Sequence, residues 1–153
     1  MSPLRRLPRG DDGSALAELA IILPLLCLLL TGLMEAGRYG YYTILVANAA
    51  RAGAQYGAQN LVTAANAGGK MEASALADGQ NVSGLSASAA EFCTCADGSA
   101  STCLPTDCAT SHRNVFVQVT ATGTFPSLLN YSALPASLRS ITVTDVVTMR
   151  VSP

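Results

Sequence analysis

Two groups of residues in this chain have types and spacings that could take part in chemistry. The first is Gly13-Ser14-Ala15-Leu16-Ala17-Glu18, where a short basic leader ends in Gly13 and a carboxylate stands five residues later, at the edge of an apolar run. An ionisable group at the edge of a membrane segment is costly unless it has a function. If the chain were cut between Gly13 and Ser14, the new amino terminus would lie close to Glu18, and the two opposite charges would offset one another. An unprocessed carboxylate at the level of the lipid headgroups is the simpler alternative.

The second group consists of four cysteines in one stretch, Cys93, Cys95, Cys103 and Cys108. An even cluster outside the cytoplasm is typical of disulfides, and the membrane topology argued below puts it there. A bridge between Cys93 and Cys95 would close a tiny strained ring, so two pairings remain: 93–103 with 95–108, or 93–108 with 95–103. A zinc site that includes His112 is the competing interpretation, but the spacings match no common zinc pattern, and we predict no metal.

The residues that catalysis would need are missing from the sequence. His112 is the only histidine, and it lies in a Thr-Ser-His-Arg segment that is typical of a loop. A nucleophile needs a positioned base, and sequence adjacency to Ser111 does not make a catalytic pair. We therefore expect a protein that is not an enzyme and needs no cofactor. The net charge of −1 and the 12% of charged residues likewise predict no nucleic-acid partner.

The group Gly13 to Glu18 lies at the start of an apolar run, Ala15 to Met34, and this run must position it. Glu18 is its only charge, and as a helix the run would span roughly 30 Å, the thickness of one hydrocarbon core. Arginines precede it at positions 5, 6 and 9, so the positive-inside rule predicts a cytoplasmic N-terminus. A cleaved signal peptide is the alternative, but cleavage after Ala36 would put Met34 where a small side chain is needed. We expect a retained single-pass anchor.

The helix is expected to continue beyond the membrane, because Glu35 to Asn60 has no proline and is rich in alanine. Small residues recur every four positions in two stripes, Gly32, Ala36 and Gly40, and then Ala49, Gly53 and Gly57. Such stripes let backbones approach closely, which suits packing against another subunit or against the chain's own sheet. Ordinary Ala/Gly composition is the alternative explanation.

Beyond residue 60 the sequence first has the composition of a connecting segment and then the alternating pattern of β-strands. A short helix is expected over Lys70 to Ala77, and strands over Val115–Thr120 and Ile141–Val147, with a third near Leu85 to Cys95. Gly123 to Arg139 contains Pro126 and Pro135 and is expected to be an excursion at the sheet edge. The predicted fold class is α+β: one N-terminal transmembrane helix that extends into a long pilin-like helix, followed by a small antiparallel sheet. The predicted regions are 1–13 (cytoplasmic leader), 14–60 (transmembrane and extended helix) and 61–153 (loop-rich outer domain).

The N-terminal third resembles a known family. Gly13, then GSALAELAIILPLLCLLLTGLMEAGR, then AARAGAQYG, is similar to the start of TadE-like proteins, minor pseudopilins of the Tad/Flp tight-adherence pilus system. The resemblance covers roughly Asp11 to Gly57, and Ile141 to Val151 also resembles the family's terminal strand. Leu19 is a departure, because the family usually has an aromatic residue after the glutamate.

This resemblance implies a function in pilus assembly, for adhesion or secretion. It implies that a prepilin peptidase, an aspartic membrane protease, cuts after Gly13. It also implies that Glu18 corresponds to the glutamate at the fifth position of mature pilins. The implied partners are the inner membrane, other pilin or pseudopilin subunits, the assembly platform proteins and a secretion ATPase, with the C-terminal domain periplasmic or extracellular. TadF-type and short TadG-type subunits share the helix pattern. A stand-alone membrane-tethered binding or adhesion module and a metal-binding periplasmic protein are the alternatives.

Overall fold

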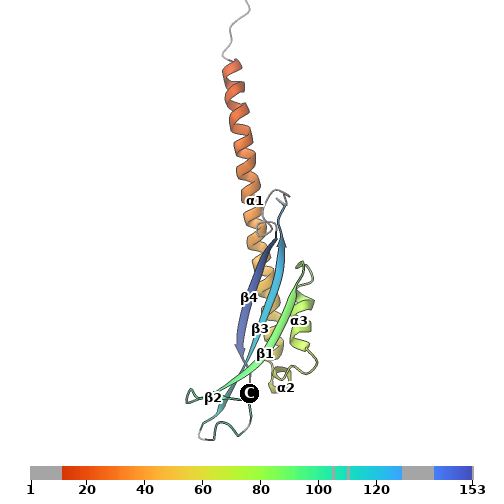
Figure 1. The fold of residues 1–153 in the computed structure, drawn as a ribbon, viewed down its shortest axis with the longest axis vertical. Coiled ribbons are helices and arrows are strands. Elements are labelled where there is room, and N and C mark those ends of the chain that lie inside the picture. The colour runs from red at the N-terminus through yellow and green to blue at the C-terminus, as the bar shows by residue number, and fades with distance from the viewer. Residues whose placement is uncertain (1–11, 105, 110, 129–139, 153) are drawn as a thin grey trace, which may run out of the picture. The chain divides into compact units, whose positions relative to one another are not determined.

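The computed structural model describes residues 12–104, 106–109, 111–128 and 140–152. The described residues form three helices and four strands, which Figure 1 labels. The helices are α1 (Asp12–Gly57), α2 (Leu61–Ala64) and α3 (Lys70–Asp78), and the strands are β1 (Ser86–Cys95), β2 (Ala100–Ser101), β3 (Arg113–Pro126) and β4 (Ser140–Arg150). The chain divides into two compact units, Met1–Gly37 and Arg38–Pro153, so α1 contributes residues to both.

Within the first unit, the described residues belong to α1 alone. The helix runs through Pro24, whose ring removes one backbone hydrogen bond. Its leucines and isoleucines are exposed, from 48% at Leu26 to 77% at Ile21. A helix that is apolar all round and not covered by protein is typical of a membrane span.

In the second unit, one face of α1 packs on the sheet. Its buried residues follow helical spacing: Tyr42, Val46, Ala49, Ala50, Gly53, Ala54 and Gly57. They meet two clusters of buried side chains, one around Met71, Val117 and Val119, and one around Val82, Ala121 and Phe125. The turn after α1 is ordered by Asn60, whose Oδ1 accepts hydrogen bonds from the amides of Val62 and Thr63, both at 3.0 Å.

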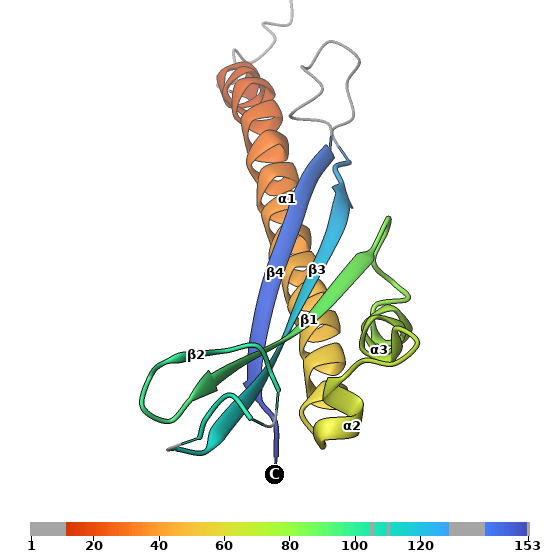
Figure 2. The same ribbon diagram turned by 60° about the horizontal axis from the view of Figure 1, so that its bottom comes forward.

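The sheet is antiparallel, in the order β2-β1-β3-β4. β3 alternates buried and more exposed residues along its length, as a strand with one covered face does. The helices lie on the covered face, and Figure 2 shows α1 running behind the sheet with α3 beside β1. Exposed residues of the other face include the hydroxyl-bearing Ser86, Ser88, Thr124, Thr142, Thr144 and Thr148.

The fold confirms the predicted α+β class and corrects some bounds. The helix ends at Gly57 and not near Asn60, where the capped turn of α2 begins. The excursion predicted from Gly123 begins later, because β3 pairs with β4 up to Pro126, opposite Ser140. The two-residue strand β2 has no predicted counterpart. Residues 1–11 of the predicted leader (1–13) and residues 129–139 lie outside the described residues.

Candidate membrane-anchoring and assembly site

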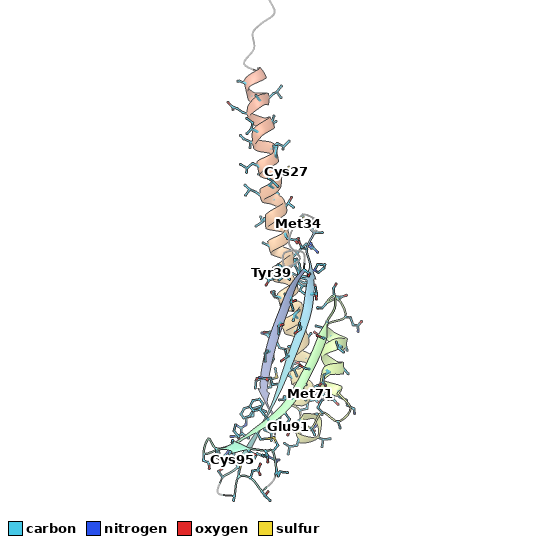
Figure 3. All side chains as sticks on the ribbon, viewed as in Figure 1. Cys27, Met34, Tyr39, Met71, Glu91 and Cys95 are labelled. Atoms are coloured by element: carbon cyan, nitrogen blue, oxygen red, sulfur yellow. A yellow bond between two sulfur atoms is a disulfide. The ribbon has the colours of Figure 1, made fainter. Side chains whose placement is uncertain are left out.

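The predicted span, Ala15 to Met34, lies wholly within α1, and its segment is long and apolar enough to cross a membrane. The side chains around Cys27 stand out from the helix in Figure 3, and Cys27 itself is an exposed free thiol. The hydroxyl of Thr31 donates to the carbonyl of Cys27 at 2.7 Å. This bond satisfies a polar group inside the helix, as hydrocarbon surroundings require.

The predicted processing residues lie at the start of α1. The helix begins at Asp12, so Gly13 and Ser14 belong to its first turn, and Glu18 follows in the second. Glu18 is exposed, as is Leu19 beside it. The helix therefore begins two residues before the predicted boundary between residues 13 and 14, while cleavage after Gly13 stays a prediction.

The two predicted small-residue stripes have different surroundings. A Cβ built on Gly53 would lie 2.8 Å from the carbonyl oxygen of Met71 and 3.1 Å from Cγ1 of Val119. One on Gly57 would collide with Sδ of Met71, and Ala49 is fully buried. The outer stripe therefore packs on the chain's own α3 and β3.

The inner stripe, by contrast, meets nothing within the described chain. A Cβ on Gly32 or on Gly40 would find no heavy atom within 4 Å, and Ala36 is exposed. Packing against another subunit remains the prediction for these three residues.

The four outer cysteines form two disulfides, Cys93–Cys103 and Cys95–Cys108, with Cα atoms 5.2 Å and 5.6 Å apart. This is one of the two pairings that spacing allowed. Both bridges tie the end of β1 to the segment that leads into β3. A carboxylate at Asp107 organises this segment: Oδ2 accepts from the Thr102 amide at 2.6 Å, the Thr102 hydroxyl at 2.8 Å and the Ser101 hydroxyl at 3.0 Å. These bonds, that of the Thr102 hydroxyl foremost, hold the pKa of Asp107 below its ordinary value.

The cysteine cluster does not form the predicted alternative, a zinc site. Glu91, Cys93 and Cys103 have their ligand atoms within 4.8 Å of one another, but the two sulfurs are bonded to each other. A disulfide sulfur is not a thiolate and offers a metal no comparable ligand. His112 is exposed, and the buried Ser111 Oγ has no hydrogen-bond partner in the described part of the chain, so the two side chains are not paired.

A contact that the sequence did not predict joins α1 to the end of β3. The Tyr42 hydroxyl lies 2.8 Å from the carbonyl oxygens of both Ser83 and Thr124, and its ring contacts Phe125 edge-on at 5.5 Å. Burial raises the pKa of Tyr42, against the opposing effect of the Thr124 hydrogen bond, so the hydroxyl keeps its proton. The Arg38 guanidinium lies 5.5 Å from the centre of the Phe125 ring. The only sequence signal was the group of three tyrosines in Tyr39-Gly40-Tyr41-Tyr42.

These features define a class of protein: a small α+β domain that shares its first helix with an exposed apolar segment suited to single-pass membrane anchoring. Residues 13–55 match the family model described as TadE-like protein, which confirms the resemblance predicted from the sequence. The match begins at Gly13 and covers the apolar segment together with most of the helix that packs on the sheet. No curated protein and no solved structure gives a match. The family suggests a protein associated with the Tad pilus.

Proposed function

We propose that this chain is a non-enzymatic, pseudopilin-like subunit that takes part in assembling a Tad/Flp-type pilus at the bacterial inner membrane. The observation that carries this proposal is the extent of the TadE-like match, which starts at the candidate cleavage residue and includes the whole exposed apolar segment. In this proposal the N-terminus is cytoplasmic and the disulfide-bonded domain lies outside the cytoplasm, where such bridges persist.

Glu18 has two tasks in the proposed mechanism. After a prepilin peptidase cuts the peptide bond between Gly13 and Ser14, the new ammonium group lies one helical turn from the exposed Glu18 carboxylate. Such a pair is stabilising near the low-dielectric edge of a membrane. In a bundle of subunits, Glu18 can instead pair with the amino terminus of a neighbour, which makes the anchor an assembly surface. The assembly platform and a secretion ATPase would act on this processed form.

The experiment is N-terminal sequencing of the protein from cells with and without the prepilin peptidase. We expect the mature chain to begin at Ser14 only when the peptidase is present. The variant Gly13→Leu should keep its leader, because the peptidase needs a small residue before the cut, whereas the control Gly10→Leu should be processed normally. An intact leader on the unaltered chain in peptidase-containing cells would refute processing.

The alternative function is a stand-alone tethered binding module, and one observation favours it. Phe92 and Phe116 stack on the open face of the sheet, with ring centres 5.3 Å apart, and Phe92 is 40% exposed. Contiguous exposed apolar surface marks many interaction sites. Co-purification separates the two functions: a pilus subunit should be recovered with pilin-type subunits and platform proteins from detergent extracts, and a stand-alone module should not.

A further inference from the structure

A cavity of about 250 Å³ opens on one flank of α1, at the start of the second unit. Its walls are the helix from Arg38 to Leu45, the segment 81–83 between α3 and β1, and the end of β3 at Phe125 and Pro126. All of these belong to the second unit. None of the described residues that line the cavity is acidic, so it does not repel an anion.

Arg38 is the cation of this cavity, and its guanidinium is held in place. It lies 5.5 Å from the centre of the Phe125 ring and donates to the carbonyl oxygen of Pro126 at 3.4 Å. Stacking on a ring engages the face of a guanidinium, while its N–H donors are arranged around the edge in the fork that phosphate oxygens fit. The cavity therefore contains a positioned group of the kind that binds phosphate.

Three further polar side chains line the same cavity. The Tyr41 hydroxyl, the Asn81 amide and the Ser83 hydroxyl are exposed, and none forms a hydrogen bond within the described residues. The position of Ser83 is fixed by its backbone, because its carbonyl oxygen accepts from the Thr124 amide at 3.0 Å and from the Tyr42 hydroxyl at 2.8 Å. These side chains can donate to a ligand that carries several oxygens.

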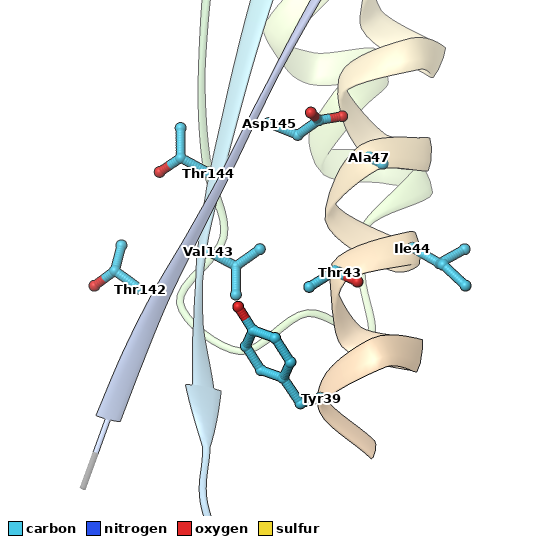
Figure 4. A pocket seen from close by; sticks show the side chains of 8 residues that line it. All are labelled: Tyr39, Thr43, Ile44, Ala47, Thr142, Val143, Thr144 and Asp145. Atoms are coloured by element: carbon cyan, nitrogen blue, oxygen red, sulfur yellow. The ribbon is translucent and has the colours of Figure 1, made fainter. Parts of the chain in front are cut away.

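The other flank of α1 has the opposite charge. A groove of about 470 Å³ runs there between α1 and the edge strand β4, and Figure 4 shows Ala47 and Asp145 on its two walls. Asp145 is half-buried, and its side chain has no hydrogen bond or ion pair among the described residues. A carboxylate there disfavours an anion, so only the flank that carries Arg38 suits one.

The length of chain between the apolar run and Arg38 indicates where the ligand comes from. The run ends at Met34, and the four residues from there to Arg38 span about 6 Å as a helix and at most about 14 Å when extended. Each headgroup layer of a bilayer is about 5–7 Å thick. When the apolar segment spans a membrane, the Arg38 side chain is therefore within reach of the headgroup phosphates.

We propose that this cavity binds the headgroup of an anionic phospholipid, with the phosphate at Arg38 and the hydroxyl-bearing end of the headgroup towards Asn81 and Ser83. The inference rests on the membrane anchoring in the proposed function and goes beyond it, because neither processing nor assembly requires a lipid site. A phosphatidylglycerol-type headgroup is favoured over phosphatidylcholine, since the cavity offers a cation to the phosphate and no carboxylate to a choline group.

The test is labelling of the full chain in phosphatidylcholine vesicles that contain a small share of a maleimide-bearing phosphatidylethanolamine, whose acylated headgroup is anionic. Ser83→Cys puts a thiol in the cavity, and the control Thr142→Cys puts one in the groove beside β4. Thr142 pairs with Thr124, whose amide binds Ser83, so the two thiols lie at one level of the sheet. Both chains carry Cys27→Ala, which removes the free thiol of the apolar segment.

Each rate of lipid labelling is divided by the rate with a soluble maleimide, which corrects for the reactivity of the thiol. We expect the corrected rate of Ser83→Cys to be about fivefold higher than that of Thr142→Cys, because a bound headgroup has a high effective concentration at the thiol. Equal corrected rates in these two chains would overturn the proposal without any change at Arg38.

Substitution of Arg38 then tests the cation. Arg38→Gln should lower the corrected rate of Ser83→Cys about fivefold, to the level of Thr142→Cys. Arg38→Lys should retain part of the excess, because it keeps the charge and loses the fork. The matched control is Arg51→Gln, an exposed arginine further along α1, which should change nothing. An excess that persists in Arg38→Gln would contradict the assigned role of Arg38.

Inorganic phosphate, compared with sodium chloride at equal ionic strength, separates a lipid from a soluble anion. A lipid whose chains stay in the bilayer keeps its high effective concentration, so phosphate should not suppress the labelling of Ser83→Cys. Suppression by phosphate alone would overturn the lipid assignment. The proposed function is judged separately: Arg38-dependent labelling of a chain that is never processed and recovers no pilus component supports the lipid site and contradicts the pilus function.

Discussion

At the scale of single residues, Tyr42 makes a polar contact between α1 and the end of β3. Its hydroxyl is the donor near two carbonyl oxygens, those of Ser83 and Thr124, and only 7% of the residue is exposed. A buried acceptor that loses its donor costs more than the bond itself contributes. The hydroxyl therefore stabilises the entry of α1 into the domain.

We expect Tyr42→Phe to lower the free energy of unfolding by about 1–2 kcal/mol while the ring contact with Phe125 is kept. The measurement is urea denaturation of the detergent-solubilised chain, followed by tyrosine fluorescence, since the chain has no tryptophan. Tyr41→Phe is the matched control, because Tyr41 is 64% exposed and should lose little. Equal stability of the two variants would contradict the assigned role of Tyr42.

At the scale of elements, α1 combines two helices with different requirements. Its first part is apolar all round, and its second part has one buried face of small residues. Small residues serve the second part because β3 and α3 approach the helix backbone closely at Gly53 and Gly57. Gly40 belongs to the other predicted stripe and lies where nothing in the described chain comes within 4 Å of an added Cβ.

Leucine substitution separates these two kinds of glycine. Gly53→Leu should lower the free energy of unfolding by about 3 kcal/mol, because its side chain collides with the Met71 carbonyl, which cannot move alone. Gly40→Leu should leave folding intact or slightly improve it, since leucine is the better helix former. Denaturation curves that coincide for the two variants would refute the packing assigned to Gly53.

At the scale of the whole molecule, the disulfides supplement a core in which alanine and valine predominate. Most of its buried residues are Ala and Val, with Phe125 and Met71 the largest fully buried side chains. The bridges close chain separations of 10 and 13 residues at one end of the sheet. A loop of that length is worth about 3 kcal/mol in the chain-entropy account.

We expect replacement of Cys93 and Cys103 together by alanine to lower the free energy of unfolding by about 2–3 kcal/mol. Removing both bridges should cost less than twice that amount, because the two loops overlap and each bridge already confines the other pair. Cys27→Ala is the control and should leave the domain unchanged, since Cys27 is outside the bridged segment. Strictly additive losses would contradict the overlap argument.

Much of this protein could be predicted from local sequence patterns. The apolar run, the inward alternation of β3 and the Gly13–Glu18 spacing each depend on neighbours in the chain, and a helix or strand periodicity records them directly. The sequence also contained the interruption at Asp145, a charge in the row Ile141, Val143, Val147. Its surroundings could not be predicted, because they depend on where α1 crosses the edge of the sheet.

The sequence by itself therefore determined the apolar segment from Ala15 to Met34, the helix beyond it, the α+β class and the resemblance of the N-terminal region to TadE-like proteins. Tertiary structure alone decided which of two cysteine pairings forms, which glycines are covered, and that Tyr42 and Asp145 border the junction of helix and strand. The physical reason is the range of the interactions. Periodicity reports contacts between residues a few positions apart. Folding of the sheet is needed to bring more distant residues together, such as Ala47 and Asp145 at the groove, or Cys95 and Cys108 in a disulfide.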